Sequence, residues 1–198
     1  MAANGVVGTG FSKPYVALYE ATTQTGVTTI SYSSGQILAR GVSVTVEADT
    51  SEDNNFYADN LQAETAAGVF GGGTVDLTVD GLKAAAEKLI MGLPVAGDNG
   101  FMAYGDSQNI PDVGLGFIRR VMSDGDTTWI PYVLPRVRFA QINIDASTQE
   151  DEIDWQTQSL SAQILRDETE NKNWKYVGTA QTSEALAEAA IKTMLDIA

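Results

Sequence analysis

Residues 42–48 read Val-Ser-Val-Thr-Val-Glu-Ala, and this stretch is the clearest indication of the fold class. The valines take every second position, and the residues between them are polar: Ser43, Thr45 and Glu47. Alternation with a period of two residues is typical of a strand that has one buried and one exposed face. We therefore start from a β-rich fold and expect these polar side chains to point away from the core.

Similar patterns recur along the chain and predict a mainly β protein. We expect strands at residues 14–20, 27–32, 74–79, 113–122, 127–143, 152–166 and 174–177. One amphipathic helix is expected to begin with Asp80 as its N-cap and to end at Gly92 and Pro94. A C-terminal helix is expected to begin at Thr182 or Ser183 and to run to residue 197. The pattern as a whole predicts an all-β meander or sandwich with two helices.

The segment around residue 50 is expected to leave the sheet. Residues 49–60 are polar and acidic, which predicts a long loop or a protruding hairpin. Gly71, Gly72 and Gly73 are expected to mark a break before the strand at residues 74–79.

Two later strands carry irregular patterns. Pro131 and Pro135 share the same parity, so both remove backbone donors from one edge, which predicts an edge strand or a strand bent between two sheets. The apolar parity of residues 152–166 switches at residues 157–159, which predicts a bulge or a strand that passes into a second sheet.

The composition excludes several classes of function. The 198 residues include no His and no Cys, so imidazole bases, thiol nucleophiles and Cys/His zinc sites are impossible. The net charge is −14, with 12 Lys and Arg against 26 Asp and Glu. DNA-binding proteins neutralise phosphates with cations, so the chain should not adhere to nucleic acid, and anionic membranes are disfavoured for the same reason. We expect a protein that is not an enzyme, has no cofactor and has no membrane partner.

Acidic clusters and tryptophans offer weaker alternatives. Oxygen ligands for calcium occur in two runs, although a solvated surface explains both better: Glu150, Asp151, Glu152 and Asp154; and Asp49, Glu52, Asp53, Asn54 and Asn55. Three tryptophans that could form a sugar-binding platform are better explained by core or interface packing: Trp129, Trp155 and Trp174. Gly114 and Gly116 lack the context of a dinucleotide fingerprint and favour a bend or a close backbone approach. Arg136 and Arg138 are expected to pair with carboxylates within or between subunits.

The order of several short motifs resembles a known family. The motifs are Gly41-Val42-Ser43-Val44, Phe56-Tyr57-Ala58-Asp59-Asn60, Gly73-Thr74-Val75-Asp76-Leu77, Val113-Gly114-Leu115-Gly116-Phe117, Leu134-Pro135-Arg136-Val137-Arg138-Phe139 and Ile153-Asp154-Trp155-Gln156-Thr157. Together they resemble the major tail (tail tube) proteins of long, non-contractile-tailed bacteriophages. The resemblance covers about residues 36–165; residues 1–35 would form an N-terminal arm and the first strands, and residues 166–198 a C-terminal strand and helix of the same single domain.

The resemblance implies a β-sandwich or barrel-like tail-tube subunit with one packed helix and a short C-terminal helix. Six subunits would form a ring through continuous sheets, and stacked rings would form a tube that conducts DNA into the host. The partners would be the protein itself, the tape measure and the tail terminator, in a virion whose tail is assembled in the host cytoplasm. A secretion-system tube, a contractile-tail inner tube or a carbohydrate-binding virion component are the alternatives.

The resemblance also suggests roles for particular residues. The loop that reaches the neighbouring ring would contain Asp49, Glu52, Asp53, Asn54 and Asn55. The lumen would be lined by Ser43, Thr45 and Glu47, and subunits would contact one another through Arg136, Arg138 and Trp155. DNA would pass through the lumen without specific binding, since an acidic wall does not hold a polyanion.

Overall fold

The alternating stretch at residues 42–48 forms strand β3 (Gly41–Thr50), as its pattern predicts. The structure is a computed structural model that describes residues 5–51, 54–58, 61–66, 68–94, 101–106, 108–144, 146, 148 and 155–198, with the backbone alone for 54–58 and 61–66. The protein is mainly β, with one large antiparallel sheet and two helices, and this confirms the expected fold class.

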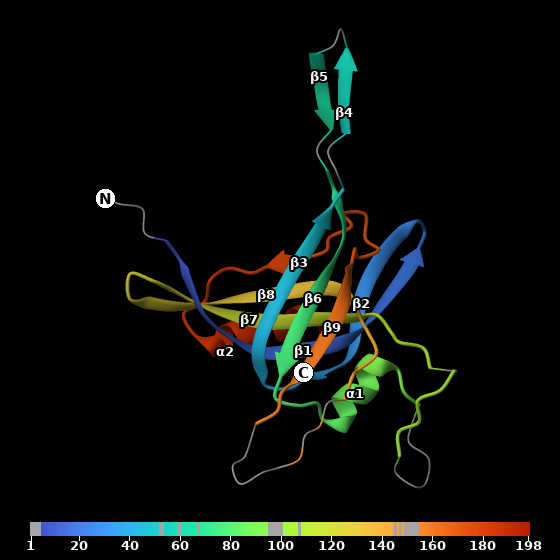
Figure 1. Ribbon diagram of the computed structural model, residues 1–198, viewed down its shortest axis with the longest axis vertical. Coiled ribbons are helices and arrows are strands. Elements are labelled where there is room, and N and C mark those ends of the chain that lie inside the picture. Colours follow the sequence, from blue (N-terminus) through green and yellow to red (C-terminus); the bar gives the residue numbers. More distant parts are fainter. Residues whose placement is uncertain are drawn as a thin grey trace.

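The large sheet follows the order β2-β1-β7-β8-β9-β6-β3, and a short β10 pairs with β8 (Figure 1). The bounds of the other strands in it are β1 (Val7–Gln24), β2 (Val27–Ile37), β6 (Phe70–Val79), β7 (Val113–Ser123), β8 (Asp126–Phe139), β9 (Gln158–Leu165) and β10 (Tyr176–Val177). The helices are α1 (Ala84–Met91) and α2 (Glu184–Met194). Within the described part of the chain, strands β4 (Asn54–Ala58) and β5 (Leu61–Ala66) pair only with each other.

The sheet curls around a main core, so the molecule is barrel-like. This core takes side chains from the inner faces of β3, β6 and β9 and from those of β1, β7 and β8, together with the buried residues of α1. Among its fully buried members are Leu77, Ile90, Leu115, Leu134 and Ile164. Burying side chains of this size contributes roughly 1.5–3 kcal/mol each.

A second, smaller core lies on the outer side of the sheet, where α2 covers β1, β7 and β8. Ala187, Ile191 and Leu195 of the helical segment are fully buried against Ala17 and Ile118 of the strands. The helix therefore covers one half of the outer sheet surface and leaves the half formed by β9, β6 and β3 bare (Figure 1).

Two glycines let α2 approach the sheet. A Cβ atom on Gly116 would lie 2.3 Å from Cγ2 of Ile191, and one on Gly114 would lie 2.7 Å from Cδ2 of Leu195. Contacts this short do not occur between real side chains, so a larger residue at either position would push the helix away. The expected close approach at these glycines is confirmed, and the approaching element is a helix.

Polar contacts hold the same helix in place. Ser183 caps α2 by accepting a hydrogen bond from the Leu186 backbone N–H, at 3.3 Å. The Glu188 carboxylate accepts hydrogen bonds from the Lys13 ammonium and from the Tyr15 hydroxyl, the latter at 2.6 Å. Those two donors, Lys13 first, hold the pKa of Glu188 below its ordinary value.

The hairpin β4–β5 projects from one end of the molecule (Figure 1). Its root is closed by Ser51 and Val69: the Ser51 N–H donates to the Val69 carbonyl at 2.9 Å, and the Val69 N–H donates to Ser51 Oγ at 3.0 Å. Of the two alternatives for residues 49–60, the protruding hairpin is therefore correct, while Asp49 belongs to β3.

Three boundary predictions are wrong. Helix α1 begins after Lys83, which makes no side-chain cap, and the Asp80 carboxylate instead accepts from the Arg40 N–H at 2.9 Å. The glycines at 71–73 lie inside β6, because Gly73 lets the strands meet where a Cβ would lie 2.4 Å from the Glu47 carbonyl oxygen. Tyr176, and not Trp174, begins the last strand.

The irregular strands are simpler than expected. Residues 155–157 are not extended in a strand, β9 begins at Gln158, and residues 152–154 lie outside the described part of the chain.

Strand β8 is interior and not at an edge. The Trp129 N–H donates to the Gln181 carbonyl, so the donors that Pro131 and Pro135 lack belong to the same edge of β8. Along that edge β8 pairs first with β10 and then with β9. Because the partner strand changes along the edge, the missing donors are tolerated.

We predict that Gly116→Ala destabilises the fold by about 1–3 kcal/mol, because its Cβ collides with Ile191. The measurement is the midpoint of urea unfolding. Gly10→Ala is the matched control, since a Cβ there would lie at an ordinary 3.6 Å from Arg120 Cβ. Combined with Ile191→Ala, which removes the colliding methyl group, Gly116→Ala should cost less than it does alone. Strict additivity of the two changes would contradict the packing described.

We further predict that Glu188→Gln destabilises the protein near neutral pH by about 1 kcal/mol, because a charged acceptor is lost. The pKa of Glu188 is lowered by folding, so its contribution is complete above the ordinary carboxyl pKa and disappears as the pH falls through the folded value. The stability difference from wild type should therefore vanish in acid, while the exposed Glu170→Gln control shows no such trend. A difference that stays constant down to pH 2 would contradict this assignment.

Candidate functional site

The bare half of the outer sheet surface is a continuous polar face, formed by β3, β6 and β9. Strand register aligns its side chains in cross-strand rows: Ser43, Thr78 and Ser159; Thr45, Asp76 and Ser161; Glu47, Thr74 and Gln163. All are exposed except the half-buried Thr78, and the residues between them in β6 and β9 are buried in the main core. We call these nine residues the polar face.

The chemistry of the polar face is simple. Hydroxyl side chains dominate it, Glu47 and Asp76 add negative charge, and none of the nine is a cation. Such a surface offers no countercharge to phosphate and no apolar area for packing. The residues expected to line a lumen, Ser43, Thr45 and Glu47, all lie exposed on it. Sequence alternation identified the β3 contribution, but the rows themselves depend on register and could not be predicted.

Both ends of the sheet are open. Among the described residues, β3 pairs only with β6 and β2 pairs only with β1, so each has one unpaired edge. Exposed apolar side chains accompany these edges: Val42 is 55% exposed on β3, and Val27 is 64% exposed on β2. Unpaired edges with exposed apolar residues are templates for pairing with another chain.

A groove of about 700 Å³ lies beside β3, where the sheet does not close into a complete barrel. Its walls include the inner face of β3 and the rings of Phe11, Phe117, Tyr132 and Trp174. Sequence reasoning missed this groove, because no local pattern shows that the barrel stays open between β3 and β1.

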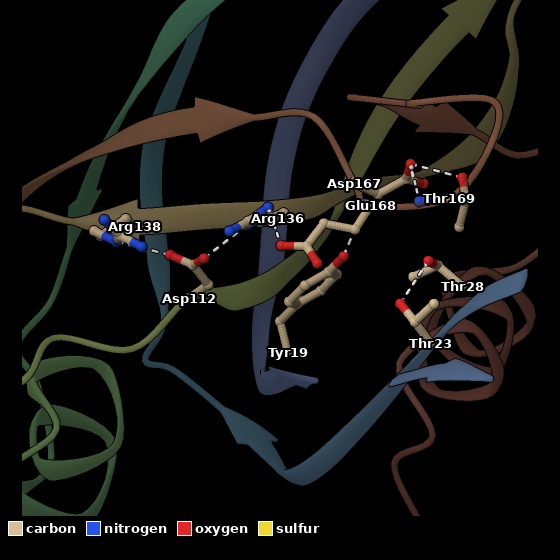
Figure 2. A network of polar contacts seen from close by, with 9 residues as sticks. All are labelled: Tyr19, Thr23, Thr28, Asp112, Arg136, Arg138, Asp167, Glu168 and Thr169. Atoms are coloured by element: carbon tan, nitrogen blue, oxygen red, sulfur yellow. Dashed lines mark hydrogen bonds and ion pairs between the residues drawn. The ribbon is translucent and has the colours of Figure 1, made fainter. Parts of the chain in front are cut away.

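The other border of the polar face is formed by the end of β8, where Arg138 lies opposite Gln163. Figure 2 shows Asp112 between two guanidinium groups: its Oδ1 lies 2.7 Å from Nε of Arg138, and its Oδ2 lies 2.6 Å from Nε of Arg136. A second contact joins Arg136 to Glu168 at 2.7 Å. The pairing within one subunit, which the sequence left open, is therefore present; a contact between subunits stays a prediction.

The turn that carries Glu168 is fixed by a buried carboxylate. Asp167 is 3% exposed, and its Oδ1 accepts from the Thr169 hydroxyl at 2.7 Å (Figure 2). The same oxygen accepts from the Asn173 N–H at 2.9 Å. Tyr19 supports the same turn, because its hydroxyl accepts the Glu168 N–H at 3.0 Å and its ring lies under the Arg136 guanidinium. These contacts hold Arg136 and Arg138, which we call the arginine border, in a defined position. Neither Asp112 nor Asp167 could be identified from the sequence alone.

The remaining predicted residues are dispersed. Trp155 is 84% exposed, as an interface residue can be, whereas Trp174 stacks on Phe70 at 4.5 Å between ring centroids and Trp129 packs against the second core. The tryptophans therefore contact different parts of the molecule and form no common platform. Asn54 and Asn55 lie in β4. Six more candidates lie outside the described residues: Glu52, Asp53, Glu150, Asp151, Glu152 and Asp154.

Neither metal ligands nor a membrane span emerges from the described part of the chain. No three acidic side chains in it gather closely enough to hold a metal ion. None of its helices combines the length and the apolar character needed to cross a membrane. Comparison of the sequence with protein-family models and with curated proteins finds no match.

Proposed function

We propose that this protein is a structural subunit of a phage tail tube, which assembles into hexameric rings that stack into a conduit for DNA. The observation that carries the proposal is the sheet with two edges, β2 and β3, that are unpaired among the residues that the structure describes. A contact between two different surfaces of identical subunits repeats head to tail and closes into a ring when the rotation allows it. In the assembly, both edges would be covered by neighbours.

The polar face would line the lumen in this arrangement. Its hydroxyl groups and carboxylates are hydrated and offer no cation, so DNA would slide along it without adhesion. Helix α2 would lie on the outside of the tube, because it covers the other half of the outer sheet surface. The role is geometric, requires no cofactor and is not enzymatic.

The hairpin β4–β5 would connect successive rings. It projects beyond the sheet, and a two-stranded hairpin is at most marginally stable in isolation, so a partner surface would stabilise it (Figure 1). The tape measure and the tail terminator would be the other partners, in a tail assembled in the host cytoplasm. A secretion-system tube or contractile-tail inner tube would use the same features, whereas a carbohydrate-binding role gains no support from the dispersed tryptophans.

Electron microscopy of the purified protein tests the proposal. Sixfold rings or tubes are expected, and their class averages give the number of subunits directly. A protein that stays monomeric at all concentrations and salt conditions, with glycan binding or hydrolysis in a screen, would overturn the proposal in favour of the carbohydrate-binding alternative.

We predict that deletion of residues 51–55 gives a folded subunit that no longer forms tubes, because the hairpin loses its root contact between Ser51 and Val69. Circular dichroism checks the fold, and negative-stain microscopy checks assembly. A control variant in which Gly and Ser replace residues 52–55 keeps the number of residues in the hairpin. It shows whether assembly depends on these side chains or on the length of the segment. Normal tubes from the deletion variant would contradict the role of the hairpin.

Cysteine labelling tests which face lines the lumen, and the chain has no natural cysteine. Thr45→Cys should react with a protein-sized maleimide reagent in free subunits but be protected in tubes, while a small maleimide still reaches it. Ala190→Cys, on the exposed side of α2, is the control and should react with both reagents in both states. Equal labelling of Thr45→Cys by the large reagent in tubes and in subunits would contradict the assignment.

A further inference from the structure

The two lateral borders of the polar face carry opposite charges. On β3, Glu47 and Asp49 are both exposed and stand two residues apart. On β8, Arg136 and Arg138 also stand two residues apart, and the Arg138 side chain is 50% exposed. Among the described residues, the acidic pair lies on a strand with an unpaired edge, and the basic pair lies at the end of β8, opposite Leu165 and Gln163 of β9.

One cross-strand row joins the two borders. Glu47 lies opposite Thr74, which lies opposite Gln163, which in turn lies opposite Arg138. The row spans four strands, so its ends are about 14 Å apart at the usual spacing of neighbouring strands. Glu47 and Arg138 of one subunit are therefore too far apart for an ion pair with each other.

Both borders retain capacity for a partner. Within the described residues, Glu47 and Asp49 take part in no ion pair. Arg138 contacts Asp112 through Nε, and a guanidinium group has five N–H donors in all. The arrangement around Asp112 and Tyr19 orients the arginines before any partner binds, which lowers the entropy lost on association.

We infer that Glu47 and Asp49 of one subunit pair with Arg138 and Arg136 of the next subunit around the ring. The inference rests on the proposed ring and specifies one contact within it: the β3 border of one copy meets the β8 border of its neighbour. The carboxylates and guanidinium groups match in sign and in spacing along their strands. Nucleic acid fits the arginine border less well, because Asp112 lies beside both arginines and Glu168 beside Arg136, on a chain of net charge −14.

Charge reversal tests the contact. Glu47→Arg and Arg138→Glu should each raise the protein concentration needed for assembly by on the order of tenfold or more, since each places like charges together. The double variant should assemble nearly as well as wild type. An equimolar mixture of the two single variants should also assemble, because alternating copies restore opposite charges at every contact of an even-numbered ring. Asp76→Arg, a reversal in the middle of the polar face, is the control and should leave assembly intact.

Cross-linking provides a measurement that does not depend on whether the Arg138→Glu variant folds. Glu47→Cys and Arg138→Cys subunits are mixed, assembled and treated with a short bis-maleimide. Dimers should form in the mixture and far less in either variant alone, because the reactive positions meet only between different copies.

The possible results separate this inference from the proposed function. Wild-type protein that forms no rings would contradict the proposed function itself. Rings that form equally well from wild type and from both single variants, or assembled mixtures without cross-linked dimers, would overturn the inferred contact and leave the ring intact. Failure of both the double variant and the mixture to recover assembly would overturn it as well.

Discussion

The unpaired backbone edge of β3 is the constraint on which the rest of the structure depends. Its neighbour on one side is β6, and the curled sheet ends on the other side without closing onto β1. Backbone N–H and C=O groups require partners, and an open barrel leaves those of an edge strand to water or to another chain. The exposed Val42 and the adjacent apolar groove would make a permanently solvated edge a liability. The proposed assembly would cover this edge.

The size of the residues on the outer sheet surface determines which half of it α2 covers. Glycine at positions 114 and 116 allows α2 to pack tightly on β7, so that half of the sheet can be apolar. On the other half, short hydroxyl side chains alternate with buried residues. The outer surface there therefore offers no apolar area against which a helix could pack. One sheet thus has an apolar half sealed by its own helix and a polar half left to solvent.

Periodicity is sufficient to predict most strands of the large sheet, both helices and the outward side of β3, because each depends on side chains close in the sequence. It does not predict β5, and it wrongly extends β9 over residues 155–157. Register, edge status and the arginine border depend on contacts between distant segments. Nothing local distinguishes Asp112 from other loop carboxylates, although it contacts both Arg136 and Arg138. The break expected at the glycines at 71–73 is wrong, because the close approach of β3 requires glycine at position 73 inside the strand. Asp80 was assigned to the wrong role, since its carboxylate contacts Arg40 and not the helix.

The net charge of −14 places a physical condition on any ring of these subunits. Neighbouring acidic subunits repel one another, but at physiological ionic strength the repulsion is screened beyond about 8 Å. Direct contacts between carboxylates and guanidinium groups are shorter than this distance and survive the screening better. A few oriented arginines at one border can therefore determine where two acidic surfaces meet, while the remaining charge keeps other faces of the subunit apart.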